Sequence, residues 1–118
     1  MAGSKNVILH FYNSTSTLQR KVVFHTDMEG VTQIAVDAAR LIRALSEPII
    51  RSGTNLRYQY SPESFMGTEM DNAVYICQRV LEELGATPEN KVILNLPSTV
   101  ENCMPNYFAD EIEYFINK

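Results

Sequence analysis

Long apolar runs, basic stretches and paired cysteines are all missing from this 118-residue chain. No run approaches the roughly 20 apolar residues of a membrane span, and the start lacks the apolar core of a secretory signal. Ten cations are set against fourteen anions, and the acidic residues are scattered, for a formal net charge of −4. We therefore expect neither a membrane nor a nucleic acid as a partner.

Cysteine and histidine are scarce. The two cysteines, Cys77 and Cys103, lack the CxxC spacing of a zinc or redox site, so we expect reduced thiols in a cytoplasmic protein. The two histidines, His10 and His25, lie far apart in the chain and do not pair at metal-ligand spacing. No metal site is predicted from these residues.

The composition fits one domain of ordinary size, because 45% of the residues are hydrophobic, which is enough for a core. We expect this domain to cover residues 1–118. Residues 1–5 (MAGSK) are expected to be a start segment or an expression remnant.

Three short apolar runs each end in small polar and acidic residues, and a helix-period pattern follows each one. Runs that are apolar at nearly every position are typical of strands in a parallel sheet. The sequence therefore predicts an α/β fold of three consecutive βα units, with the chemistry in the loops at the carboxyl ends of the strands. The apolar runs are residues 7–12, 56–60 and 91–96, and the polar segments after them are 13–16, 61–63 and 97–101.

Helical patterns fill the intervals between these runs. The first is composite: a short amphipathic stretch over 17–24, then a helix after Asp27 that Pro48 and residues 52–55 are predicted to stop. The next opens at Thr68, whose hydroxyl is predicted to cap the amide of Asp71, and ends at Gly85; the last opens at Pro105. The predicted buried stripes are Val31, Ile34, Ala35, Ala38, Leu41, Ile42 and Leu45, then Ala73, Cys77, Val80, Leu81 and Leu84, then Phe108, Ala109, Ile112 and Phe115.

Three βα units leave two strand edges and an inner sheet face uncovered. A closed (β/α)8 barrel needs about 250 residues, so this chain accounts for only part of one. We expect the uncovered inner face to carry His10, Tyr60 and Asn95. Either the remainder of a barrel or self-association of the chain is expected to cover it.

Three sequence segments, in this order, resemble the central part of 2-isopropylmalate synthases of the fungal and actinobacterial type. They are residues 10–20 (HFYNSTSTLQR), residues 60–65 (YSPESF) with 67–69, and residues 92–101 (VILNLPSTVE) with 105–106 and 109–110. The resemblance implies three central units of a TIM (β/α)8 barrel. It also implies a condensation of acetyl-CoA with 2-oxoisovalerate, followed by thioester hydrolysis, in leucine biosynthesis.

The same resemblance implies a divalent metal, Mg²⁺ or Zn²⁺, whose ligands are an aspartate of an Arg-Asp motif and a His-x-His pair. Neither motif is present in this chain. The resemblance assigns catalytic roles to Glu63, beside the reacting acetyl group, and to His10. It assigns substrate binding to Thr99, which faces the carboxylate of the oxo acid, and to Ser61.

Three of these residues also have a structural interpretation. In it, His10 is a hydrogen-bonded core histidine, Glu63 an acid ahead of a helix, and Thr99 a turn residue. At the level of the whole chain, the alternative is a free-standing, non-catalytic α/β binding or assembly module with a flavodoxin-like or partial-barrel sheet.

Overall fold

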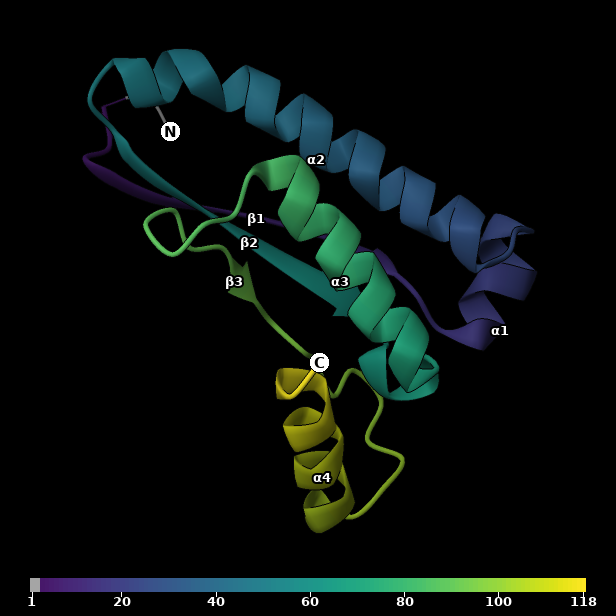
Figure 1. Ribbon diagram of the computed structural model, residues 1–118. Coiled ribbons are helices and arrows are strands. Elements are labelled where there is room, and N and C mark those ends of the chain that lie inside the picture. The colour runs from purple at the N-terminus through teal and green to yellow at the C-terminus, as the bar shows by residue number, and fades with distance from the viewer. Residues whose placement is uncertain (1–2) are drawn as a thin grey trace.

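The computed structural model describes residues 3–118 as a parallel three-stranded sheet with helices on one face (Figure 1). The strand order is β1-β2-β3, with β1 at Asn6–Ser14, β2 at Asn55–Glu63 and β3 at Ile93–Leu94. This confirms the predicted α/β fold of three consecutive βα units. Residues 1–2 of the predicted start segment lie outside the described residues.

Helices follow each strand. After β1 come α1 (Thr17–Gln19), a π-helix (Arg20–Phe24) and the long α2 (Met28–Arg51); after β2 come a 3-10 helix (Phe65–Gly67) and α3 (Met70–Leu84); after β3 comes α4 (Pro105–Ile116). The composite first helical region is confirmed: His25 turns the chain with a φ of 51°, and Asp27 caps the Gly30 amide at 2.9 Å. None of the described helices is both long and apolar enough to cross a membrane.

α2 and α3 cover one face of β1 and β2, and the core lies between these layers (Figure 1). β1 and β2 pair over nine residues, from Asn6 opposite Asn55 to Ser14 opposite Glu63. Because side chains alternate along a strand, every second residue faces the helices. The most deeply buried core side chains are those of Val31, Ala35, Ala39, Tyr60, Phe65, Ala73, Ile76, Cys77, Val80 and Leu84.

The opposite face of the sheet is open. Ile8 and Tyr12 on β1 are 58% and 63% exposed, and His10 between them is exposed as well. The placement of Tyr60 on this face was wrong: its side chain is fully buried under the helices, and its hydroxyl donates to Asn13 Oδ1 at 2.7 Å. Tyr60 has the opposite parity along β2 from Ser61, which does face the open side.

Two details of α2 differ from prediction. Pro48 lies inside the helix, which continues for one more turn to Arg51 before Ser52 and Gly53 end it. The predicted apolar stripe is also rotated, because the buried side of α2 faces the sheet and α3. Ile34, Leu41 and Leu45 are exposed, while Thr32, Val36, Ala39 and Ser46 are buried.

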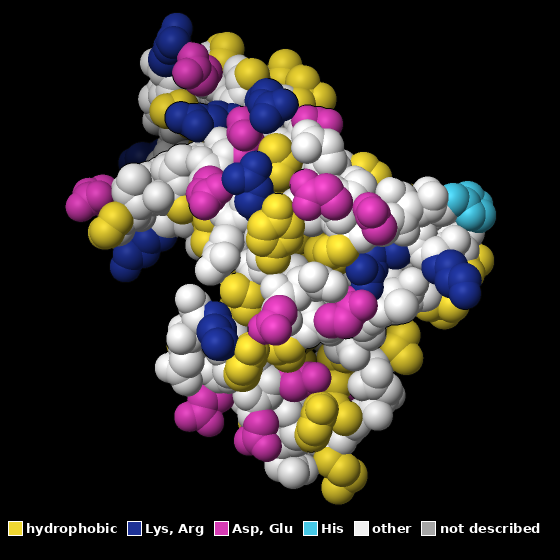
Figure 2. Space-filling model, turned by 45° about the vertical axis from the view of Figure 1, so that its right-hand side comes forward, with side chains coloured by type: hydrophobic (Ala, Val, Ile, Leu, Met, Phe, Trp, Pro, Cys, Tyr) yellow, Lys and Arg dark blue, Asp and Glu magenta, His cyan; other side chains and the backbone are white. Residues whose placement is uncertain are grey.

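The third unit is shorter and less buried than predicted. Only Ile93 and Leu94 of the predicted 91–96 strand form the ladder with β2, and the Asn95 amide adds one hydrogen bond to the Tyr60 carbonyl at 2.9 Å. α4 begins at Pro105 after Met104, as predicted, but none of its residues is fully buried, and Ala109 is exposed. On the face that Figure 2 shows, acidic and basic side chains are interspersed with hydrophobic ones.

Candidate functional site

The strand register brings polar side chains together on the open face near the carboxyl ends of β1 and β2. Ser14 pairs with Glu63 and Tyr12 with Ser61, and paired residues of parallel strands project to the same side. Successive same-face residues lie about 6.6 Å apart along a strand. Ser61 and Glu63 therefore form one continuous row, with His10 and Ser14 beside it on β1.

The midpoint of this face holds a hydrogen-bonded chain of three side chains from three strands or their extensions. His10 Nε2 lies 2.8 Å from Ser61 Oγ, and Asn95 Nδ2 donates to the same oxygen at 2.8 Å. Ser61 is 3% exposed, so its hydroxyl is the buried centre of the chain. Because Ser61 accepts from Asn95, its own proton is free to be donated to His10 Nε2. That direction leaves the proton of a neutral imidazole on Nδ1.

Glu63 ends β2 with its carboxylate tied to β1. Ser14 Oγ donates to Glu63 Oε2 at 2.5 Å. Glu63 is partly buried and Ser14 is buried, so this hydrogen bond limits the rotamers open to the carboxylate. The other oxygen, Oε1, has no protein partner within the described residues and is available for chemistry.

Ser64 turns the chain sharply after Glu63. It has a φ of 58°, a left-handed conformation that is uncommon for a residue with a Cβ. Its amide donates to Thr99 Oγ1 at 3.1 Å. Because that hydroxyl accepts from Ser64, its own proton remains free to donate to a ligand. One turn thus connects the carboxylate of Glu63 to the hydroxyl of Thr99.

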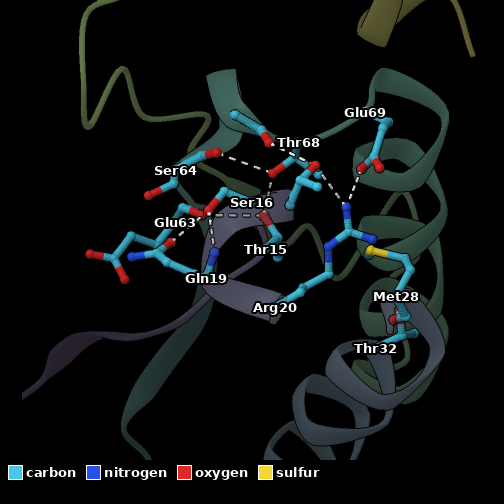
Figure 3. A network of polar contacts seen from close by, with 12 residues as sticks. Thr15, Ser16, Gln19, Arg20, Met28, Thr32, Glu63, Ser64, Thr68 and Glu69 are labelled. Carbon is cyan, nitrogen blue, oxygen red and sulfur yellow. Dashed lines mark hydrogen bonds and ion pairs between the residues drawn. The ribbon is translucent and has the colours of Figure 1, made fainter. Parts of the chain in front are cut away.

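The loops after β1 and β2 are joined by a polar network (Figure 3). Arg20 forms an ion pair with Glu69, and Arg20 Nη2 also donates to Thr17 Oγ1 at 3.1 Å. The hydrogen bond from Arg20 lowers the pKa of Glu69 to about 2. Thr68, predicted to cap α3, instead turns its hydroxyl toward Thr15, and α3 begins at Met70 without a side-chain cap. The Thr68 hydroxyl therefore pairs with the buried Thr15 hydroxyl in place of a helix amide.

The structure brings His10 and Ser61 into direct contact, and it links Glu63 to Thr99 through the amide of Ser64, the residue that follows Glu63. Sequence analysis did not assign Ser14 or Asn95 to the site. Both carried a usable signal, because each is a polar residue at the carboxyl end of a predicted strand. Ser14 has the same parity along its strand as His10.

Among residues 3–118, no three His, Cys, Asp or Glu side chains gather in a way that could hold a metal ion. The carboxylate of Glu63 is hydrogen-bonded by the hydroxyl of Ser14, and the imidazole of His10 by the hydroxyl of Ser61. These residues do not by themselves fit a divalent metal centre.

Comparison with known proteins gives consistent matches over nearly the whole chain. The family model described as HMGL-like matches residues 2–118. The 2-isopropylmalate synthase of Rhizobium johnstonii is 53% identical over 114 residues, which are 97% of this chain and 20% of that protein. The 2-isopropylmalate synthases of Brucella suis and Corynebacterium glutamicum are each 54% identical, over 97% and 95% of this chain and 20% and 18% of their own lengths. The chain spans about a fifth of the length of the curated relatives it matches.

Proposed function

This chain belongs to the HMGL-like family, a family of TIM barrels, and from this we propose that it is a segment of a 2-isopropylmalate synthase. The segment corresponds to three central βα units of the barrel, with the site at the carboxyl ends of its strands. The proposed reaction condenses acetyl-CoA with 2-oxoisovalerate and then hydrolyses the thioester. The observation that carries the proposal is the Glu63 carboxylate, which Ser14 holds on the open sheet face and which directly precedes the Ser64 amide that binds Thr99.

The reaction needs a base, because a methyl proton of acetyl-CoA must leave before carbon can attack the ketone. We assign this role to Glu63, whose carboxylate takes the proton while the C–H electron pair becomes the enolate. The enolate carbon then bonds to the ketone carbon of the oxo acid, whose C=O electron pair moves to oxygen. Ser14 supports the assignment by holding Oε2 and leaving Oε1 free to receive the proton.

The remaining residues supply hydrogen bonds. We propose that His10, oriented by Ser61, donates to the oxygen that gains negative charge, since donors in place before the reaction stabilise such charge. Thr99 binds the oxo acid, because its free proton suits the carboxylate, and Ser61, whose proton is donated to His10, acts on the substrate through that imidazole. Water finally hydrolyses the thioester, which releases CoA as a thiol and the product as an acid.

The family implies a divalent metal, Mg²⁺ or Zn²⁺, which would polarise the ketone of the oxo acid. We propose that its ligands come from residues outside this segment, since no ligand cluster forms among residues 3–118. The contribution of this chain is then confined to the base, the hydrogen-bond donors and the wall of the substrate pocket.

The test uses an intact synthase that contains this segment. Glu63→Gln should lower kcat by about 10²- to 10⁴-fold while the KM for the oxo acid changes little, because the amide cannot accept the proton. Thr99→Ala should instead raise the KM for the oxo acid. Glu89→Gln, the same chemical change in an exposed loop before β3, is the matched control. An unchanged kcat for Glu63→Gln would remove the base role.

A further inference from the structure

The loops after β1 and β2 meet through polar side chains that are almost completely withdrawn from solvent (Figure 3). Buried polar groups are unfavourable unless they are hydrogen-bonded, so a cluster of them at a loop contact restricts the loops to few arrangements. The residues, with their exposed fractions, are Thr15 (0%), Ser16 (7%), Arg20 (8%) and Thr68 (8%).

Thr15 holds the backbone of Glu63 directly. Its amide donates to the Glu63 carbonyl at 3.0 Å, and its hydroxyl reaches the same carbonyl at 3.2 Å. The Thr15 and Thr68 hydroxyls lie 2.8 Å apart, and Thr68 reaches the Ser64 carbonyl at 3.1 Å. The two peptide groups that flank Ser64 are therefore linked to one pair of buried threonines.

The two threonine hydroxyls share their protons among three hydrogen-bond contacts. The two hydroxyls have two protons, but there are three contacts to satisfy: one to each carbonyl and one between the hydroxyls. The backbone already supplies each carbonyl with a donor, from the Thr15 amide to Glu63 and from the Gly67 amide to Ser64, at 3.0 and 2.9 Å. No carbonyl is therefore left unpaired in either proton arrangement, and the hydroxyl pair can remain bonded throughout.

A second set of contacts, which involves Arg20, also connects the loops after β1 and β2. Arg20 binds Glu69 just before α3 and Thr17 in its own loop, and the Thr17 hydroxyl lies 3.5 Å from the Gly67 carbonyl. The loops also approach closely, because a Cβ added to Gly67 would lie 3.1 Å from Ser16 Cβ. This distance is shorter than ordinary packing.

The segment held in this way contains the strained residue of the site. Ser64 has a φ of 58°, and such a conformation persists only where surrounding contacts impose it. Its geometry sets both the direction in which Glu63 leaves β2 and the position of the amide that binds Thr99. A small relaxation of Ser64 would move the carboxylate and the threonine hydroxyl together.

We propose that Thr15 and Thr68, with Arg20 bracing them, are positioning residues that clamp the β1 and β2 loops and hold the Glu63 carboxylate where it takes the substrate proton. This proposal rests on the function proposed above. The clamp touches no substrate, so its loss should reduce the rate of the chemical step more than it weakens substrate binding. A displacement on the order of 1 Å at a reacting group lowers rates by about 100-fold.

The test compares Thr15→Val with Thr15→Ser in an intact synthase containing this segment. Valine keeps the shape and removes the hydroxyl, so kcat should fall by about 10- to 100-fold while the KM for both substrates stays within about twofold. Serine restores the hydroxyl and should keep kcat within about threefold of wild type. Ser46→Ala is the control, because it removes a buried hydroxyl that binds only the Ile42 carbonyl within α2. It should leave kcat unchanged.

If Thr15→Val fails to fold, Thr68→Val decides, with the same expected fall in kcat. Equal kcat for wild type and the folded valine variant would overturn the clamp. So would a fall in kcat that serine does not restore. Glu63→Gln measured in parallel separates the two proposals: its failure to lower kcat contradicts the base role. A normal Glu63→Gln effect beside an inert valine variant contradicts the clamp alone.

Discussion

The first two βα units and the third are built differently. β1 and β2 pair over nine residues beneath two well-packed helices, whereas β3 has two residues and α4 has no fully buried side chain. A groove of about 670 Å³ separates α3, β3 and α4, lined largely by apolar side chains such as Leu81, Leu94 and Ile112. Most of the core is therefore formed by the first two units, and the third unit packs against the edge of that core.

One buried aromatic ring contributes to the attachment of α4. Phe65, which is fully buried, packs edge-to-face against Phe108 and Phe115, with ring centroids 6.3 and 6.0 Å apart. Phe65 directly follows the strained Ser64. The third unit therefore meets the first two at the same turn that carries the proposed base.

This contrast also divides the proposed chemistry. Glu63 belongs to the well-packed half, where Ser14 and the threonine pair restrain it, while Thr99 lies exposed in the loop of the third unit. Proton transfer needs accurate placement, whereas a hydroxyl that binds a substrate carboxylate tolerates larger displacements. We therefore expect substitutions in the first half to change kcat and substitutions in the third unit to change KM.

The largest expected effect is the loss of activity in the 118-residue chain alone. With acetyl-CoA and 2-oxoisovalerate it should release no CoA above background, because no ligand set for a polarising metal forms among residues 3–118. A coupled assay of free CoA, with an intact synthase as the positive control, measures this. Turnover within tenfold of the intact enzyme would contradict both this expectation and the division of roles.

Core truncations in the two halves should differ in size. Ile76→Ala removes a fully buried side chain of α3 and should lower the free energy of unfolding by about 2–5 kcal/mol. Phe115→Ala in α4 removes a partly exposed ring and should lower it by about 1–2 kcal/mol. Urea unfolding of the 118-residue chain gives both values. A larger loss for Phe115→Ala would mean that the third unit is integral to the core.

Because of the Arg20–Glu69 ion pair, we expect the stability of the contact between the β1 and β2 loops to depend on pH. The pKa of Glu69 is lowered from 4.5 to about 2, so its stabilising effect is present above pH 4.5 and is lost as the pH falls toward 2. Wild type should exceed Glu69→Gln in stability at pH 6, and the difference should vanish near pH 2. Thermal unfolding at several pH values measures this difference.

Glu83→Gln is the control for that series. Glu83 pairs with Arg40 across α2 and α3, where the two side chains are 25% and 60% exposed, so its loss should change stability by about 0.5 kcal/mol or less. A pH-independent difference for Glu69→Gln, or an equal effect of the two variants, would show that burial of Arg20 does not strengthen its ion pair.

The smallest expected effect is the difference between the two thiols. Cys77 lies in the core and burial raises its pKa to about 12, whereas Cys103 lies partly exposed in the loop before α4. A thiol reagent at pH 8 should modify Cys103 first and Cys77 only when the core opens. Mass spectrometry of the partly labelled chain measures the order. Equal labelling rates would indicate that the core of the first two units opens as readily as the third unit.

The number and order of the βα units, the composite first helix and the loops that carry the polar residues could all be predicted from the amino-acid sequence. These follow from local patterns: apolar runs, helical periodicity, and the chemistry of residues such as Asp27 and Pro105 at helix starts. Most of the predicted stripe on α3 is buried for the same reason, because Ala73, Cys77 and Val80 lie on the side of the helix that packs against α2 and β2.

The contacts between side chains of different strands could not be predicted in this way. They depend on the strand register and on the face that each residue occupies, which are visible only in the folded structure. Tyr60 and Ser61 are neighbours in sequence, yet one enters the core and the other binds His10 and Asn95. Thr68 lies at a position that suits a helix cap, but in the folded chain its hydroxyl pairs with that of the buried Thr15. The pairing of Ser14 with Glu63 likewise depends on a register that spans 49 residues of chain, beyond the range of any local pattern.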